Sequence, residues 1–98
     1  MKKSDVIHKL KAREPEIRAR GARALYIFGS VRHDRATESS DVDLIVDYDP
    51  HRKFSLIDLV GLQQFIEDDL EQRVELLTID GIHHRLREPI LADAERVF

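Results

Sequence analysis

Two aspartates, Asp41 and Asp43, stand one residue apart at the start of an apolar segment. On an extended strand such residues share one face, roughly 6 to 7 Å apart at Cα, so their carboxylates can lean toward one site. If the two charges come within ~4 Å, they repel by about 4 kcal/mol at an effective dielectric constant near 20. A cation removes this cost, and hard oxygen ligands suit Mg²⁺ or Mn²⁺. The pair is therefore a candidate metal site, with two solvated aspartates at an exposed strand start as the alternative.

Gly29 and Ser30 form a second candidate element, because they end the apolar segment 24–28. A tight turn directly after a buried strand can aim backbone N–H groups and a hydroxyl at an anion. The pattern is also that of an ordinary turn, so the phosphate-binding interpretation depends on what lies nearby.

Glu75 is the third element, an acidic residue between Val74 and Leu76 on a segment that could pair with the strand of Asp43. Alone, it is equally consistent with the exposed face of an edge strand. Together, a phosphate turn and three carboxylates supply the parts for nucleotidyl transfer. A divalent cation bridges the triphosphate, an acceptor hydroxyl is positioned or deprotonated, and pyrophosphate leaves in line.

Three strands are predicted to position these residues, over 24–28, 42–48 and 73–79. In the second strand, side-chain alternation places Val42, Leu44 and Val46 on one face. The opposite face then carries Asp41, Asp43, Ile45 and Asp47. The segment 24–28 is apolar throughout and too short for a typical helix, which favours a buried strand.

Helices are predicted around these strands. The first is capped by Ser4, broken or restarted at Pro15, and ends near Gly21. The most regular pattern follows Ser55, which with Asp58 resembles a capping box, and runs to Leu70. A last helix, interrupted or started at Pro89, is expected over 85–94 and a short strand over 96–98. This order describes an α/β (α+β) fold, a small mixed β-sheet flanked by helices, with a helical segment over 1–21.

The composition indicates one soluble domain spanning residues 1–98. Apolar residues make up 42% of the chain and charged residues 36%, with a formal net charge of −3. No broad basic surface follows from this balance, so direct nucleic-acid binding is not expected. The chain has no cysteine and no apolar run long enough to span a membrane. A cytoplasmic location without membrane contact is the expectation.

The segment from Gly29 to Val46 resembles the signature of the polymerase-β-like nucleotidyltransferase superfamily, a G-S turn followed by [ST]-D-V-D-L-I-V. The sequences D-Y-D-P, S-L-I-D-L-V-G-L-Q-Q, V-E-L-L-T and L-R-E-P-I-L-A-D-A are similar to those of minimal nucleotidyltransferase (MNT) proteins. The similarity covers about residues 22–98.

This resemblance implies an antitoxin that transfers AMP from ATP to a tyrosine of a cognate HEPN ribonuclease toxin. By residue, it implies nucleotide binding at Gly29, Ser30, Arg32 and Ser40. It implies catalytic and Mg²⁺- or Mn²⁺-binding roles for Asp41, Asp43 and Glu75. The predicted partners are thus ATP and the toxin protein.

Two departures from the family pattern bear on catalysis. The third carboxylate is usually aspartate, whereas this chain has Glu75. Relatives often carry arginine and glycine where this chain has His33 and Asp34, and Arg32 or Arg35 could supply the missing charge. An alternative is therefore an antitoxin that binds nucleotide but silences the toxin by complex formation. Transfer to a small molecule or to RNA is less favoured, because such relatives generally need a further domain to hold the acceptor.

Overall fold

The computed structural model describes residues 2–33 and 41–98. Nine elements follow one another in these residues: α1 (Lys3–Ala12), α2 (Glu14–Ala19), β1 (Ala22–Phe28), α3 (Gly29–Arg32), β2 (Val42–Tyr48), α4 (Leu56–Leu70), β3 (Val74–Thr78), α5 (His84–Asp93) and β4 (Glu95–Arg96).

The four strands form one mixed sheet in the order β3-β2-β1-β4. β1 pairs antiparallel with both β2 and β4, whereas β2 and β3 are parallel. Parallel neighbours need a crossover connection, and α4 supplies it. The small mixed sheet flanked by helices confirms the predicted fold class.

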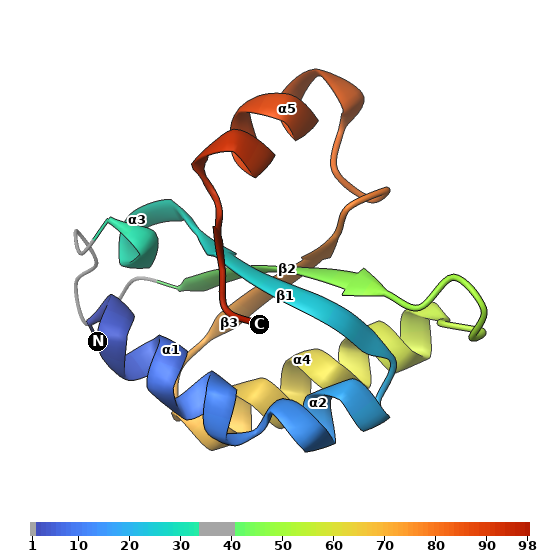
Figure 1. The fold of residues 1–98 in the computed structure, drawn as a ribbon, viewed down its shortest axis with the longest axis horizontal. Helices are drawn as coiled ribbons and strands as arrows, with labels where there is room; N and C mark the ends of the chain where they lie inside the picture. The colour runs from blue at the N-terminus through green and yellow to red at the C-terminus, as the bar shows by residue number, and fades with distance from the viewer. Residues whose placement is uncertain (1, 34–40) are drawn as a thin grey trace.

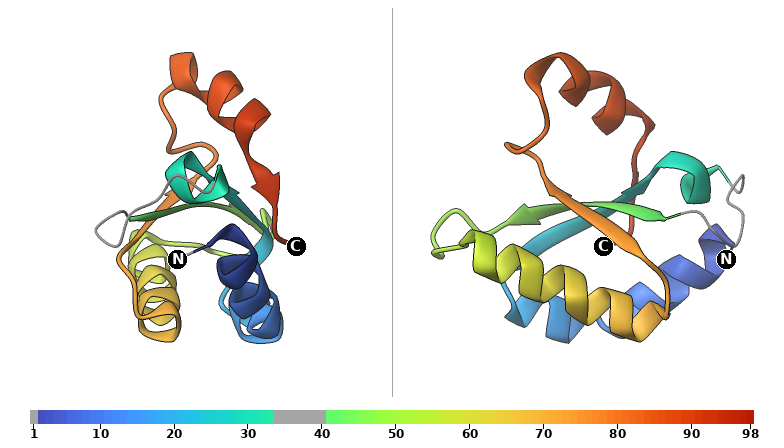
Figure 2. Two further views of the ribbon diagram at one scale, coloured as in Figure 1. Left: turned by 90° about the vertical axis from the view of Figure 1, so that its left-hand side faces the viewer. Right: turned by 180° about the vertical axis from the view of Figure 1, so that it is seen from behind.

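Helices α1, α2 and α4 lie against one face of the sheet, and α5 stands on the other side (Figures 1 and 2). The hydrophobic core fills the first interface. It includes Val42, Leu44 and Val46 from β2, together with Leu62 and Ile66 from α4. The predicted alternation along β2 is therefore confirmed, and Asp43 and Asp47 lie on the opposite face. We call this opposite face of the sheet the open face.

Strand β2 begins and ends at the predicted residues, and β3 is one residue shorter than predicted at each end. The capping box of α4 is present: the Ser55 side chain accepts a hydrogen bond from the Asp58 backbone, and Asp58 accepts one from the backbone of Ser55. Pro15 lies in the first turn of α2, where its missing N–H costs nothing.

Several predicted boundaries were wrong. β1 begins at Ala22, two residues before the predicted start, and β4 covers Glu95–Arg96 where 96–98 was predicted. Ser4 lies inside α1, and Lys2 is the N-cap residue, because the helix begins two residues earlier than predicted and has no side-chain cap. The last helix is neither broken nor begun at Pro89: α5 runs from His84 through Pro89 to Asp93. The N-cap at His83, whose ring accepts a hydrogen bond from the Arg85 backbone, explains the earlier start of α5.

Helix α5 is joined to the body at both ends but buries none of its residues. In both views it stands away from the sheet, between the end of β3 and the start of β4 (Figure 2). β4 anchors the chain again by pairing with Tyr26 and Ile27 of β1. The helices in the described part of the chain are too short or too polar to cross a membrane.

Candidate active site

The parallel pairing of β2 and β3 places Asp43 directly opposite Glu75. Neighbouring strands lie about 4.8 Å apart, so side chains on the same face at paired positions touch. Val42 and Leu44 beside Asp43 point into the core, as do Val74 and Leu76 beside Glu75. Both carboxyl groups therefore face the open side of the sheet, although 32 positions separate them along the chain.

Asp43 holds its proton more tightly than an ordinary aspartate. Burial, the charge of Glu75, a hydrogen bond with Glu75 and the charge of Asp41 raise its pKa from 3.8 to about 6. Partial burial and the nearby negative charges both favour the protonated form of Asp43. A bound cation would displace the proton of Asp43 and relieve the repulsion.

Gly29 lies against the Asp43 carboxylate. Its backbone adopts a φ of +76°, which side-chain-bearing residues rarely adopt, and a β-carbon at Gly29 would collide with Asp43 Oδ2. In the sheet, Phe28 pairs with Asp43 and brings the turn to this position. The turn and one of the aspartates predicted from the sequence thus form a single site.

Asp41 lies just before β2, and its Oδ1 is 3.6 Å from Arg73 Nε. Within residues 2–33 and 41–98, no three His, Asp or Glu side chains converge as a ready-made metal cage. Mg²⁺ is usually bound through one or two carboxylates, with substrate phosphates and water completing its shell. The Asp43 and Glu75 carboxylates fit such an ion, and Asp41 is close enough to influence the charge of Asp43.

Arg32, at the end of α3, is the cation nearest to the turn in sequence. Its Nη2 is 3.7 Å from Glu95 Oε1, and the same carboxylate oxygen is 3.3 Å from Lys3 Nζ. Arg32 Nε is buried without a hydrogen-bond partner in the described structure. A buried, unsatisfied guanidinium nitrogen costs free energy, and an anionic ligand at the turn would supply an acceptor.

His33, the residue directly after α3, contacts α5. Its Nε2 lies 2.7 and 2.9 Å from the two carboxylate oxygens of Asp93. The contact ties the last residue of α5 to the end of α3. His33 is therefore engaged in holding α5 in place.

For the remaining residues predicted from the sequence, the structure gives little or no side-chain geometry. Ser30 lies in α3 beside Gly29, and Ser40 and Asp34 lie outside the described residues. Sequence reasoning missed Asp93 and Glu95, which bind His33 and Arg32. Asp93 belongs to the L-R-E-P-I-L-A-D-A segment, but that similarity names no partner for it, and Glu95 lies just after the segment. Each acid lies about 60 residues from its partner, so no local pattern indicates these contacts.

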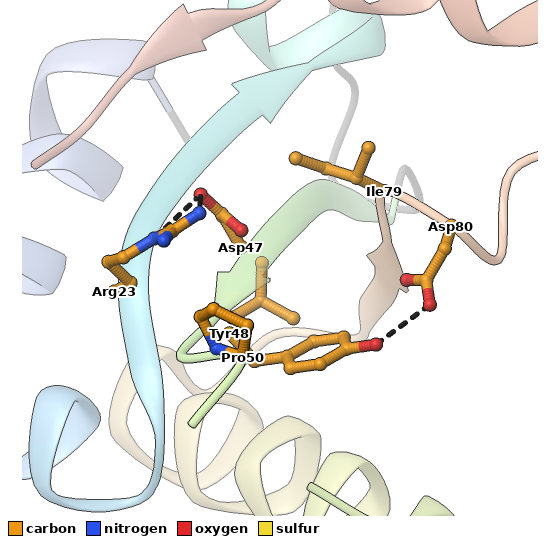
Figure 3. A pocket seen from close by; sticks show the side chains of 7 residues that line it. Arg23, Asp47, Tyr48, Pro50, Ile79 and Asp80 are labelled. Carbon is orange, nitrogen blue, oxygen red and sulfur yellow. Dashed lines mark hydrogen bonds and ion pairs between the residues drawn. The ribbon is translucent and has the colours of Figure 1, made fainter. Parts of the chain in front are cut away.

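A separate cavity of about 230 Å³ lies at the other end of β2, lined by Arg23, Val46, Asp47, Tyr48, Pro50, Ile79 and Asp80 (Figure 3). Its polar groups pair with one another. Arg23 Nη2 donates to Asp47 at 2.9 Å, and the Tyr48 hydroxyl donates to Asp80 at 2.7 Å. None of the predicted site residues lines this cavity.

The nucleotidyltransferase domain model matches residues 5–97, so the chain belongs to this family. Protein adenylyltransferase MntA of Thermococcus cleftensis is 32% identical over 85 residues, which are 86% of this chain and 84% of the relative. A protein of Methanocaldococcus jannaschii, MJ0126, is 37% identical over 62 residues, 63% of this chain. The match spans 61% of the length of MJ0126.

Solved structures share the fold. A minimal nucleotidyltransferase structure superposes with a TM-score of 0.74 at 32% identity, covering 97% of this chain and 95% of that one. A toxin–antitoxin crystal structure with AMP-PNP gives a TM-score of 0.71 at 18% identity, covering 100% of this chain and 73% of that one. A tri-AMPylated HEPN toxin of Shewanella oneidensis in complex with MNT antitoxin gives 0.68 at 16% identity, covering 98% and 71%.

Proposed function

We propose that this protein is an antitoxin that transfers AMP from ATP to a tyrosine of a HEPN ribonuclease toxin. The observation that carries the proposal is the Asp43 and Glu75 pair facing the Gly29 turn, in a chain of the nucleotidyltransferase family. The relative named protein adenylyltransferase and the solved complex with an AMPylated toxin support AMP as the transferred group and a toxin as the acceptor.

In the proposed reaction, the tyrosine oxygen bonds to the α-phosphorus of ATP. The bond from that phosphorus to the bridging oxygen breaks, and pyrophosphate leaves with its electron pair. Glu75 is exposed on the open face, and we assign it the role of the base that accepts the proton of the tyrosine hydroxyl. The turn at Gly29 and Ser30 and the guanidinium of Arg32 bind the triphosphate, with Ser40 as the fourth nucleotide contact.

Asp41 and Asp43 are the proposed ligands of a divalent cation, Mg²⁺ or Mn²⁺, together with Glu75. When bound, the ion neutralises charge on the phosphates and on the leaving pyrophosphate. Asp43 must lose its proton to bind the ion, so cation affinity should rise with pH through the Asp43 pKa of about 6.

The toxin must reach the open face, and α5 stands on that side of the sheet (Figure 1). Leu86 on α5 is 55% exposed, and no residue of α5 is buried against the body. A domain this small has little surface of its own to hold the acceptor, so the toxin would complete the site. We assign α5 to toxin docking, on the side of the sheet that the acceptor tyrosine must reach.

The test is transfer to purified toxin. The toxin is incubated with this protein and Mg-ATP, and tyrosine peptides are examined by mass spectrometry for one added AMP. The adduct is expected with the wild type and lost with Asp43→Asn and Asp41→Asn. Asp47→Asn is the matched control, because Asp47 lies on the same face of β2 but pairs with Arg23. Transfer by Asp43→Asn at the wild-type rate would overturn the assignment.

A second candidate is an antitoxin that silences the toxin by binding alone. The observation that favours it is the contact of His33 with Asp93. His33 stands where the family pattern would place a basic residue, and this contact keeps its side chain away from the phosphates. In that case neutralisation needs one antitoxin per toxin and survives Asp43→Asn. Neutralisation by far less than one equivalent, with an AMP adduct, excludes it.

A further inference from the structure

The outer side of α4 carries an apolar patch that the core does not use. Leu56 is 74% exposed, Ile57 84% and Val60 60%, all within the first five residues of the helix. The core-facing side of α4 is provided by different residues, Leu62 and Ile66 among them. An amphipathic helix normally turns polar residues to water, so three exposed apolar side chains in the first turns of α4 form a candidate interaction surface.

This patch is far from the candidate active site. α4 packs on the core face of the sheet, whereas Asp43 and Glu75 lie on the open face (Figure 2). A partner bound on the open face cannot cover the outer side of α4 in the same contact, because the sheet and the helix layer lie between them. The patch therefore needs its own occupant.

The charges along α4 favour a second copy of the same chain. The basic residues His51, Arg52 and Lys53 precede the helix, and the acidic Asp68 and Glu71 are exposed at its other end. Two antiparallel α4 helices related by a two-fold axis would place each basic loop near the acidic end of the other helix. The helix dipoles also oppose each other favourably in this arrangement.

The spacing of the outer residues supports the same packing. Ile57, Val60, Gly61, Gln64 and Asp68 recur at three and four residues, so they form one stripe along the helix. Gly61 adds no side chain of its own to the stripe, and the Arg20 guanidinium lies beside it, with Nη1 3.8 Å from where a β-carbon of Gly61 would stand. With Ile57 of one copy beside Val60 of the other, Lys53 lies opposite Gln64 of the second copy, and Asp68 of that copy follows about one helical turn further along.

We propose that two copies of this protein associate through the outer stripe of α4. The apolar area is small for a stable dimer, so the association is concentration-dependent, with a dissociation constant in roughly the micromolar range. The interface leaves the open face and α5 of both copies accessible.

The first experiment measures molecular mass by sedimentation velocity over a range of concentrations. The wild type is expected to shift from monomer to dimer, and Ile57→Glu with Val60→Glu should remain monomeric. These side chains are exposed, so circular dichroism should show an unchanged fold. Leu86→Glu, an exposed leucine on α5, is the matched control and should still dimerise. A wild type that stays monomeric at all concentrations overturns the proposal, as does a dimer that only Leu86→Glu dissociates.

Charge exchange tests the antiparallel arrangement itself. Lys53→Glu and Asp68→Lys should each weaken the dimer by about two- to five-fold, as expected for exposed ion pairs. The double variant should recover most of the wild-type affinity. Additive weakening in the double variant contradicts the proposed pairing. If the monomeric wild type instead requires Ile57 and Val60 to bind the toxin, the toxin is the occupant and the proposal fails.

Discussion

Asp43 combines two opposed requirements in one side chain. The proposed cation requires it to be charged, yet it is partly buried and lies beside Glu75, and these two causes raise its pKa to about 6. The folded state holds this proton more tightly than the unfolded chain, whose aspartates titrate near 3.9. Stability therefore falls as the pH rises from about 4 to 6, and the full cost remains above that window.

The corresponding prediction is that Asp43→Asn stabilises the protein at neutral pH. Because Asp43 is partly exposed, we discount the pKa shift and expect a gain of about 1 to 2 kcal/mol in unfolding free energy at pH 7.5. The gain should vanish near pH 3.5, where the wild-type carboxyl is protonated. Urea unfolding at both pH values measures it, with Asp47→Asn as control. An equal gain at both pH values would contradict the electrostatic explanation.

A related prediction concerns the backbone at Gly29. Gly29→Ala forces a side chain onto a positive φ and into the Asp43 carboxylate, so we expect a loss of about 1 to 3 kcal/mol. Thermal or urea unfolding provides the measurement. Removing the obstacle as well, in Gly29→Ala with Asp43→Ala, should recover part of the loss. If the changes in unfolding free energy of the two single variants simply add up in the double variant, the collision is not the cause of the loss.

At the scale of elements, α4 and α5 are held in different ways. α4 is fixed by its capping box and its buried side chains, whereas α5 depends on its connections and on polar contacts such as His33 with Asp93. Because few buried contacts hold α5, it should unfold locally at a much lower free energy than α4.

For α4, we expect Ser55→Ala to lower the unfolding free energy by about 1 kcal/mol, because the Asp58 backbone N–H loses its acceptor. Ser55→Asp should retain most of the stability, since aspartate is an equally good N-cap residue. Chemical denaturation of the three proteins measures the effect. A Ser55→Ala variant as stable as the wild type would show that the cap contributes nothing.

For α5, we expect Asp93→Ala to increase amide hydrogen exchange in α5 at least several-fold while leaving β1 and β2 protected. The lost pair is largely exposed, so global stability should change by less than about 1 kcal/mol. Glu88→Ala, on the same helix, is the control. Unchanged exchange in α5 would mean that its connections alone hold it.

For the whole molecule, the two exposed apolar surfaces lie on opposite sides. α5 stands on the side of the open face and α4 on the other side of the sheet (Figure 1). The exposed residues of the outer stripe are not among those by which α4 contacts the core. The proposed assignments therefore predict separable binding defects for the two surfaces.

Leu86→Glu is expected to weaken toxin binding at least tenfold, because a charge would be buried at the centre of the proposed docking surface. Ile57→Glu should leave toxin binding unchanged while disrupting self-association. Isothermal titration calorimetry with the purified toxin distinguishes the two variants. Loss of toxin binding in Ile57→Glu alone would reverse the assignment of the surfaces.

Local sequence patterns predicted which face of β2 is buried and where α4 begins. Alternation along 42–48 places Asp43 and Asp47 away from the core, and the Ser55 and Asp58 pair marks the start of α4. Such features depend on residues within a few positions of one another, so the sequence contains them directly. The G-S turn followed by S-D-V-D-L-I-V also predicted the nucleotidyltransferase family, and the match of the family model confirms it.

Only the tertiary structure decided what depends on distant residues. The register of β3 on β2, which places Glu75 opposite Asp43, arises from packing both strands on α4. The contacts of His33 with Asp93 and of Arg32 with Glu95 join residues about 60 positions apart. No local pattern encodes such pairs, because their free energy exists only once the sheet and α5 are in place.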